Sequence, residues 1–367
     1  MTKIGIVGIG AISGIYLNNL TKVFKEVEII AVCDLIKERA QKAQSEYNIP
    51  KLYDTMEELF DDIEIDIVLN LTRPYEHYEV TKAALEAGKH VYSEKPLAAT
   101  LIEGNELVQL AKDYNLLLGG APDTFLGAGI QTCRKLIDDG FIGKPVGAAA
   151  FMICHGHESW HPDPEFYYKH GGGPMMDMGP YYLTALTNLL GGIKSVTGVA
   201  RTTFPERTIT SEPKSGTVVN VDVATNVTGI LEFDTGAIAT LYTTFDVHYN
   251  GQARFEVYGS EGTLLVPDPN TFGGTIYLLR KEEKEYKEIP LMFNYAENSR
   301  GLGLADMAKA LETKRRPRAD YRQTLHVLEA MSAFQTSSDN RATVDLKSKF
   351  TREESMKGHP VTGVIPS

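Results

Sequence analysis

Residues 3–14 have the sequence KIGIVGIGAISG, and this stretch decides the fold of the first part of the chain. Residues 4–7 form a short apolar run with β-branched side chains, which predicts a buried strand. Two glycines follow at once, and apolar residues at near-helical spacing continue from Ile15 to Phe24. Strand, glycine turn and helix in this order predict a dinucleotide-binding unit, in which Gly8 permits the tight turn and Gly10 lets the backbone approach a pyrophosphate.

The helix expected after this turn would present free N–H groups and a partial positive charge to a bound anion. We therefore expect Ala11 and Ile12 to bind the cofactor together with the two glycines. The third glycine position of the fingerprint is Ser13, which is small, and Gly14 follows it.

A second apolar run, residues 28–34, ends in Asp34, about 20 residues beyond the turn. A carboxylate at this place accepts hydrogen bonds from both ribose hydroxyls and repels a 2′-phosphate. Leu35 follows, and no arginine stands beside the acid to receive that phosphate. The sequence therefore predicts NAD as the cofactor in preference to NADP.

Strand-like and helix-like segments alternate through residue 118, which predicts a doubly wound parallel sheet, an α/β Rossmann domain. Ligands of such sheets bind beyond the carboxyl ends of the strands. Two further polar turns fall at such ends, and their residues are predicted to contact the cofactor. These residues are Thr72, Pro74, His77, Glu94 and Lys95.

The texture of the sequence changes from Ala121 onward and becomes rich in strand-forming residues. Loose alternation of apolar and polar residues is typical of half-buried antiparallel strands. We predict a Rossmann domain over residues 1–122, an α+β domain with a large, mostly antiparallel sheet over 123–345, and a C-terminal tail over 346–367. The strands expected in the second domain are 146–154, 196–203, 218–233, 237–247 and 253–258.

The net charge of −11 predicts a surface that repels nucleic acid and anionic lipid, so neither is an expected partner. The sequence contains no uncharged stretch of about 18 apolar residues, so no membrane span is expected. The N-terminal apolar run leads into the glycine motif rather than into a signal-peptide cleavage site. Cys33, Cys133 and Cys154 are widely spaced and form no C-x-x-C pair. We expect a cytoplasmic protein.

Four motifs in order resemble those of the Gfo/Idh/MocA (glucose-fructose oxidoreductase / inositol dehydrogenase / rhizopine catabolism) family, over nearly the whole chain. They are Gly8-x-Gly10, Thr72-x-Pro74 with His77, Glu94-Lys95-Pro96, and the glycine run 171–181 that contains Asp177 and ends in Tyr181. The resemblance implies an NAD(P)-dependent dehydrogenase acting on CH–OH groups, with the C-terminal sheet supporting a homodimer or homotetramer.

The resemblance also assigns catalytic roles. Lys95 matches the lysine that contacts the substrate hydroxyl and the nicotinamide ribose, and Asp177 matches the acid of the family triad. Tyr181 stands where many members have histidine. A tyrosine at this position resembles the glucose-fructose oxidoreductase branch more than inositol dehydrogenase. Free tyrosine and lysine titrate at about 10 and about 10.4. A neighbouring ammonium lowers the pKa of a tyrosine, and burial lowers the pKa of a lysine. Tyr181 or Lys95 is therefore the expected proton acceptor, oriented by Asp177.

Residues 155–168 are dense in histidine, aromatic and acidic side chains. Aromatic faces with polar edges suit a sugar ring and its hydroxyls. The histidines fall at i, i+2 and i+6, which fits no familiar zinc pattern, so no metal is expected. The predicted substrate-binding residues are His155, His157, Trp160, His161 and Tyr182.

We expect an oxidoreductase that transfers a hydride between NAD and a secondary hydroxyl of a sugar, polyol or glycoside. Two alternatives stay open. One is a lyase or hydrolase that retains NAD and oxidises its substrate transiently. The other is a non-enzymatic NAD-binding regulator, although such a protein need not keep Lys95, Asp177 and Tyr181 together.

Overall fold

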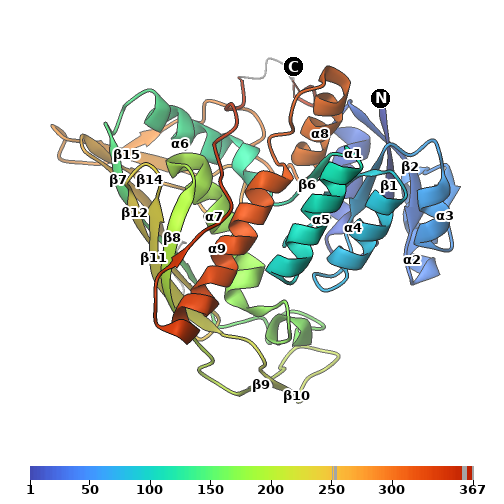
Figure 1. Cartoon of the computed structure of the whole chain (residues 1–367), viewed down its shortest axis with the longest axis horizontal. Helices are drawn as coiled ribbons and strands as arrows, with labels where there is room; N and C mark the ends of the chain where they lie inside the picture. Colours follow the sequence, from blue (N-terminus) through green and yellow to red (C-terminus); the bar gives the residue numbers. More distant parts are fainter. Residues whose placement is uncertain (250, 252–253, 358–361, 366–367) are drawn as a thin grey trace. The chain divides into compact units, whose positions relative to one another are not determined.

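The chain divides into two compact units (Figure 1). The first consists of Met1–Gly127, Phe293–Leu325 and Met356–Ser367. Ala128–Met292 and His326–Ser355 supply the second. The structure is a computed structural model that describes residues 1–249, 251, 254–357 and 362–365. Helix α9 (Tyr321–Asn340) begins in the first unit and continues in the second, so the C-terminal part of the chain contributes to both.

The first unit is built on six parallel strands in the order β3-β2-β1-β4-β5-β6. The strand order reverses between β1 and β4, and this switch point is where doubly wound sheets bind their ligands. All four residues of β4 are buried, as expected for a strand whose two faces are covered. The strands are β1 (Thr2–Val7), β2 (Val27–Cys33), β3 (Lys51–Leu52), β4 (Ile67–Asn70), β5 (His90–Ser93) and β6 (Leu118–Gly120).

Helices alternate with these strands, and local sequence explains where several of them begin. Thr55 and Thr100 cap α3 and α5, and in both cases a glutamate three residues later completes a reciprocal capping box. The helical elements of this unit are α1 (Ser13–Lys22), α2 (Lys37–Tyr47), α3 (Met56–Asp61), α4 (His77–Glu86), α5 (Leu101–Asp113), η1 (Thr124–Leu126) and α8 (Leu302–Thr313).

The returning segment that carries α8 is attached to the Rossmann sheet by buried polar contacts. Asp123 Oδ2 accepts hydrogen bonds from the N–H groups of Gly301 (2.9 Å) and Gly303 (3.0 Å), so this carboxylate caps the start of α8. Asn19 Nδ2 on α1 donates to the carbonyl oxygens of Asn298 and Arg300, both at 2.9 Å. Two segments far apart in the sequence therefore form one folded unit.

The second unit is built on nine strands in the order β16-β15-β14-β13-β7-β12-β11-β8-β17. Neighbouring strands are antiparallel except β7 and β12, which are parallel. Two short strands, β9 and β10, pair with each other outside this sheet. The strands are β7 (Pro145–Ile153), β8 (Ile193–Arg201), β9 (Glu206–Thr208), β10 (Val218–Asn220), β11 (Asn226–Phe233), β12 (Ile238–Thr244), β13 (Arg254–Gly259), β14 (Gly262–Leu265), β15 (Ile276–Arg280), β16 (Lys287–Ile289) and β17 (Val344–Asp345).

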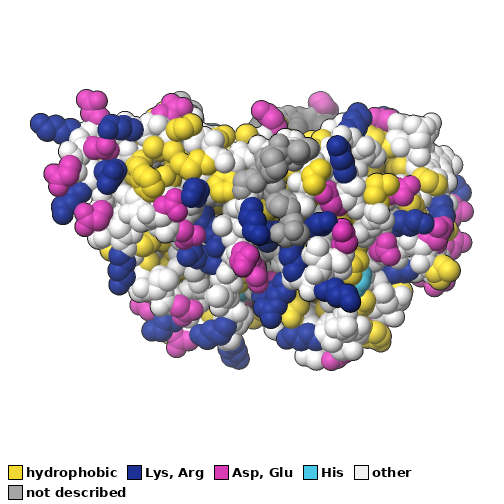
Figure 2. Space-filling view, turned by 90° about the horizontal axis from the view of Figure 1, so that it is seen from above, with side chains coloured by type: hydrophobic (Ala, Val, Ile, Leu, Met, Phe, Trp, Pro, Cys, Tyr) yellow, Lys and Arg dark blue, Asp and Glu magenta, His cyan; other side chains and the backbone are white. Residues whose placement is uncertain are grey.

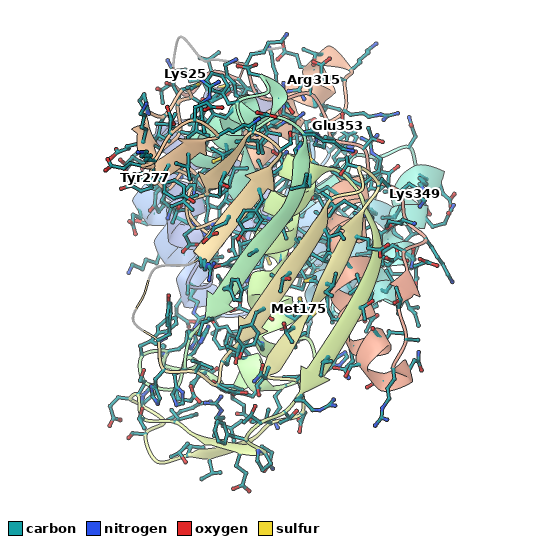
Figure 3. All side chains as sticks on the ribbon, turned by 90° about the vertical axis from the view of Figure 1, so that its left-hand side faces the viewer. Lys25, Met175, Tyr277, Arg315, Lys349 and Glu353 are labelled. Carbon is teal, nitrogen blue, oxygen red and sulfur yellow. The ribbon has the colours of Figure 1, made fainter. Side chains whose placement is uncertain are left out.

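One face of this sheet is covered by helices and the other is open (Figure 3). Along β8 and β12 buried residues largely alternate with exposed ones, as expected when one face packs on a core. The covering elements include α9, whose Ser337 Oγ accepts a hydrogen bond from Gly198 N of β8 at 2.8 Å. The other helical elements of this unit are α6 (Ala128–Asp138), η2 (Glu165–Tyr168) and α7 (Gly173–Leu190).

The predicted fold class is confirmed: a parallel Rossmann sheet precedes a large, mostly antiparallel sheet. The predicted strands 146–154, 196–203 and 237–247 are confirmed to within three residues at each end. The predicted strand 218–233 is two strands, because β10 pairs with β9 and only β11 joins the main sheet. Residue 253 of the last predicted strand lies outside the described residues.

Helix α7 was not predicted from the sequence, because glycines and prolines obscure its pattern. Pro174 stands in its first turn, where a proline without an N–H is tolerated, and Pro180 lies inside the helix. Gly173 has a φ of +86°, and a Cβ there would lie 2.8 Å from the carbonyl oxygen of Ala224. The glycine run therefore allows the chain to enter α7 close to a neighbouring backbone.

Candidate active site

The turn after β1 has the geometry that a dinucleotide pyrophosphate requires. Gly8 has a φ of +95°, and a Cβ there would lie 2.8 Å from the carbonyl carbon of Leu71, so only glycine fits. A Cβ at Gly10 would meet no atom within 4 Å, so the space beyond this residue is open. Helix α1 begins at Ser13, and the side chain of Ile12 does not cap it, so the positive end of the helix dipole faces this turn.

Asp34 is held at the end of β2 by the backbone of this same turn. Its Oδ2 accepts a hydrogen bond from Ile9 N at 2.5 Å, and its Oδ1 accepts one from Ile36 N at 2.7 Å. Each carboxylate oxygen keeps a second lone pair, so the group can still accept ribose hydroxyls. The residues of this edge thus fit the pyrophosphate and the ribose of a dinucleotide.

A buried network shapes the turn after β4. Asn70 is fully buried, and its Oδ1 accepts hydrogen bonds from Thr72 N (3.1 Å) and Thr72 Oγ1 (2.6 Å). Its Nδ2 donates to the carbonyl oxygen of His77 and to Thr81 Oγ1. Sequence reasoning missed Asn70, whose only signal is its place at the end of a buried strand. Pro74 lies in this same turn, between Thr72 and α4.

The ring of His77 connects this turn with the Glu94-Lys95-Pro96 turn. Its Nδ1 is 2.7 Å from the carbonyl oxygen of Pro96, and its Nε2 is 3.1 Å from that of Thr72. Burial lowers the pKa of His77, although both backbone contacts act in the opposite direction. The structure thus engages both ring nitrogens within the protein, and His77 fixes the two turns relative to each other.

Glu94 is buried at the end of β5, directly before Lys95. Its Oε1 accepts a hydrogen bond from Tyr16 OH at 2.7 Å, and its Oε2 accepts one from Lys95 N at 3.0 Å. Asp123 lies nearby, and burial raises the pKa of its carboxyl to about 6. Burial raises the pKa values of Tyr16 and Tyr92 as well. Sequence reasoning missed Tyr16 as a support of the Lys95 turn, and it missed Asp123 as the cap of α8.

In the second unit, the N-terminal half of α7 carries Asp177 and Tyr181 one helical turn apart. Asp177 Oδ2 lies 3.4 Å from Nε2 of His157, a residue of the loop after β7. Tyr181 is 7% exposed. Tyr182 is 2% exposed, and its hydroxyl donates to the carbonyl oxygen of Phe151 at 3.4 Å, so its ring is part of the core.

The histidine-rich loop packs aromatic rings around His157, the residue whose Nε2 faces Asp177. The ring of His157 lies 3.9 Å from that of Tyr167 and 4.7 Å from that of Phe245, measured between centroids. Trp160 is 62% exposed, and its ring lies 5.3 Å from that of His157 and 5.4 Å from that of His161. The structure therefore brings three of the predicted substrate-binding residues together.

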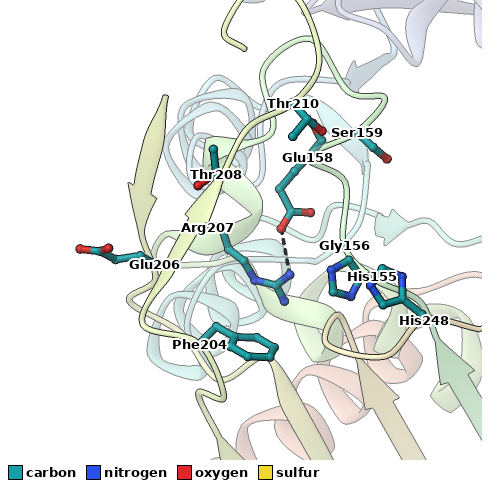
Figure 4. Close-up of a pocket in the computed structure, with 10 residues that line it drawn as sticks. All are labelled: His155, Gly156, Glu158, Ser159, Phe204, Glu206, Arg207, Thr208, Thr210 and His248. Carbon is teal, nitrogen blue, oxygen red and sulfur yellow. Dashed lines mark hydrogen bonds and ion pairs between the residues drawn. The ribbon is translucent and has the colours of Figure 1, made fainter. Parts of the chain in front are cut away.

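A cavity whose lining residues are mostly polar or charged lies beside this loop (Figure 4). Arg207 at its base donates to Glu158 Oε1 at 2.9 Å, to the carbonyl oxygen of Phe245 at 2.8 Å and to Asp246. His155 stacks on His248 with 3.5 Å between the ring centroids. The buried arginine neutralises carboxylates from two segments and so holds the loop in place. Sequence reasoning missed Arg207. Of the predicted substrate-binding residues, His155 lines this cavity, together with His248.

The described residues contain no group of three or more His, Cys, Asp or Glu side chains arranged to hold a metal ion. Acidic and basic side chains are interspersed on the face seen in Figure 2, with no large patch of a single sign. No helix in the described part of the chain is both long enough and apolar enough to cross a membrane.

Comparison with known protein families follows the two units. Residues 2–120 match the family described as "Oxidoreductase family, NAD-binding Rossmann fold", and residues 130–265 match the "GFO/IDH/MocA C-terminal domain". The chain belongs to the Gfo/Idh/MocA oxidoreductase family. The family prediction is thereby confirmed, and so is NAD as the cofactor class of its Rossmann unit.

Individual relatives agree with this assignment. The inositol 2-dehydrogenase/D-chiro-inositol 3-dehydrogenase of Lactiplantibacillus plantarum is 36% identical over 40% of this chain and 42% of its own length. The myo-inositol 2-dehydrogenase of Thermotoga maritima is 25% identical over 72% of this chain and 74% of its own length. The chain thus spans less than half of the first relative and about three quarters of the second.

Solved structures show the same fold over almost the entire chain. Levoglucosan dehydrogenase in complex with NADH and levoglucosan superposes with a TM-score of 0.80 at 20% identity, over 95% of this chain and 99% of that one. An NAD-binding oxidoreductase from Klebsiella pneumoniae superposes with a TM-score of 0.82 at 22% identity, over 94% and 98%. At these identities the likeness establishes the fold.

Proposed function

We propose that this protein is an NAD-dependent dehydrogenase that oxidises a secondary hydroxyl of a sugar, polyol or glycoside. The observation that carries the proposal is the pair of Asp177 on α7 and the His157 imidazole that it faces, whose ring is bordered by the rings of Trp160 and Tyr167. Aromatic faces stack on sugar rings, and a carboxylate orients hydroxyls. Relatives whose names specify inositols and levoglucosan support this substrate class.

The first unit supplies the cofactor-binding residues of the proposal. The turn at Gly8, Gly10, Ala11 and Ile12 holds the pyrophosphate, and Asp34 holds the adenosine ribose and rejects a 2′-phosphate. Bound NAD supplies the hydride acceptor. The residues of the two neighbouring turns shape the nicotinamide side; they are Thr72, Pro74, His77, Glu94 and Lys95.

Catalysis in this proposal requires a group that takes the hydroxyl proton as the hydride leaves. Lys95 and Tyr181 are the two candidates that the family pattern supplies, and Asp177 orients the hydroxyl. Glu94 holds the backbone of Lys95 in place, because its carboxylate accepts a hydrogen bond from the Lys95 N–H. The loop residues His155, His157, Trp160 and His161 border the substrate, and Tyr182 supports α7 from the core.

The decisive experiment is a panel of sugars, polyols and glycosides offered to the purified protein with NAD and, separately, NADP. Formation of NADH is followed by its absorbance, and products are identified by mass spectrometry. Net NADH with NAD, and much less with NADP, supports the proposal. A product without net NADH would instead indicate transient oxidation by a retained cofactor, and NAD binding without any product would indicate a regulator.

We further propose a homo-oligomer formed through the open face of the nine-stranded sheet. Val199, Ile230 and Ile238 on adjacent strands point out of that face and are 49%, 48% and 54% exposed. Exposed apolar residues gathered on one face are typical of protein interfaces. Ile230→Lys is expected to yield monomers in light scattering coupled to size-exclusion chromatography. A native protein that is monomeric at high concentration contradicts this proposal.

We also propose a cytoplasmic location. The three cysteines are free thiols in the structure, and two of them are buried. Such usage is typical of a reducing compartment. Fractionation of cells that produce the protein, followed by immunodetection, tests this location, and recovery in a secreted fraction would contradict it.

A further inference from the structure

Helix α7 carries tyrosine at position 181, yet an imidazole still faces its acid. His157, from the loop after β7, places Nε2 3.4 Å from Asp177 Oδ2. Both side chains are largely buried, at 11% and 15% exposed, and each keeps a small solvent-accessible edge. A carboxylate at this distance from an imidazole nitrogen orients the ring and fixes which nitrogen faces it.

The packing around His157 does not require a histidine. Its ring lies against Tyr167 and Phe245, and both contacts would suit an apolar ring. Its Nδ1 is buried without a hydrogen-bond partner among the described residues. A buried polar atom without a partner destabilises the folded protein, and a phenylalanine at this position would avoid that cost. The contact between His157 Nε2 and the Asp177 carboxylate is the interaction that a phenylalanine could not make and that offsets this cost.

Glu158, His161 and Tyr168 are the other ionisable residues that lie beside His157 in this loop. Glu158, the next residue, is matched by Arg207 at 2.9 Å. His161 lies in the same loop, and burial, followed by the charge of His157, lowers the pKa of His161. Tyr168 OH accepts the backbone N–H of His157 at 3.4 Å. Asp177 is therefore the carboxylate that the His157 imidazole faces.

We propose that His157 is the proton reservoir of the reaction and acts through Asp177. This inference rests on the proposed dehydrogenase function. As the substrate C–H bond breaks, its electron pair leaves as hydride to NAD, and the carbon–oxygen double bond forms. The hydroxyl O–H bond breaks and its proton passes to Tyr181 or Lys95. From that group the proton passes through the Asp177 carboxylate to Nε2 of His157. The exposed edges of the two side chains return the proton to water after product release.

His157 is thus a positioning and relay residue, and its test needs a readout beyond activity loss. His157→Phe keeps the aromatic packing and removes both nitrogens, whereas His157→Gln keeps a hydrogen-bonding side chain that does not titrate. Both variants are expected to bind NAD normally and to lose about 10²–10⁴-fold in kcat, the usual contribution of acid–base catalysis. The acid limb of the pH–rate profile should disappear in His157→Gln, because an imidazole titrates between about pH 5 and 8 and an amide does not.

A double-mutant cycle with Asp177→Asn tests whether the two residues act as one unit. In that background, His157→Gln is expected to add less than about 3-fold, because groups that act in series are not additive. Normal turnover by His157→Phe, or fully additive effects in the cycle, would overturn the relay.

A measurement on the resting protein separates this inference from the dehydrogenase proposal. The imidazole nitrogen resonances of His157, assigned by their loss in His157→Gln, are expected to move in Asp177→Asn. Unchanged resonances would overturn the pairing even in an active enzyme. If the native protein oxidises no member of the substrate panel, the dehydrogenase proposal and the relay both fail, while the resonances still report whether the two side chains are paired.

Discussion

Alanine substitutions at three glycines around the first turn, Gly8, Gly10 and Gly14, can separate effects on NAD binding from effects on stability. At Gly8 an alanine would occupy a φ of +95°, at a cost of roughly 1–2 kcal/mol, and its Cβ would lie 2.8–2.9 Å from the backbone of Leu71 and Thr72. Backbone atoms yield little, so Gly8→Ala is expected to lose about 2–4 kcal/mol of unfolding free energy. Urea denaturation followed by circular dichroism measures this loss.

Gly10→Ala is expected to behave in the opposite way. Its Cβ would meet no protein atom within 4 Å, so the unfolding free energy should stay within about 0.5 kcal/mol of the native value. The same methyl group would occupy the space proposed for the pyrophosphate. The dissociation constant for NAD, measured by calorimetry, should therefore rise about 10-fold or more, which corresponds to about 1.4 kcal/mol.

Gly14→Ala is the matched control for stability. A Cβ there also meets nothing within 4 Å, but the residue lies inside α1, where alanine is favoured over glycine by about 0.5–1 kcal/mol. This variant should be more stable than the native protein. The reasoning is refuted if Gly10→Ala binds NAD as tightly as the native protein, or if Gly8→Ala is no less stable than Gly14→Ala.

Three further perturbations probe the supports of the site. Lys95→Ala should abolish turnover of any substrate found in the panel while calorimetry shows NAD binding largely intact; near-normal turnover would contradict its catalytic role. Asp123→Asn should flatten the dependence of unfolding free energy on pH, as measured by urea unfolding. The folded pKa of Asp123, about 6, lies above its unfolded value, so the native protein loses up to about 3 kcal/mol of stability as the pH rises from about 4 to about 6. The asparagine does not titrate, so the variant should not show this loss. Arg207→Met should cost about 3–5 kcal/mol of unfolding free energy, since it leaves Glu158 and Asp246 buried without their cation; a loss below about 1 kcal/mol would mean that the cluster does not hold the loop.

The predictable parts of this protein are those in which chemistry and local chain geometry coincide. Gly8 and Gly10 lie two residues apart in one turn, and Asp34 directly follows the next strand, so their spacing along the chain was enough to predict that they lie together. Supports that act across the fold gave no such signal. Tyr16 bonds Glu94 from 78 residues away, and Asp123 caps a helix start 178 residues later. Such contacts depend on which segments return to the sheet, and periodicity carries no information about that return.

The surroundings of Asp177 show the same limit at shorter range. The motif that contains Asp177 and Tyr181 indicates the acid but not the direction in which it points. That direction is set by where α7 begins, and the start of α7 depends on a glycine that enters close to the backbone of Ala224. The imidazole that meets the acid comes from a loop whose rings pack on one another and whose base is fixed by Arg207. The motif therefore does not indicate His157, because a motif records positions along the chain and His157 comes from a separate loop.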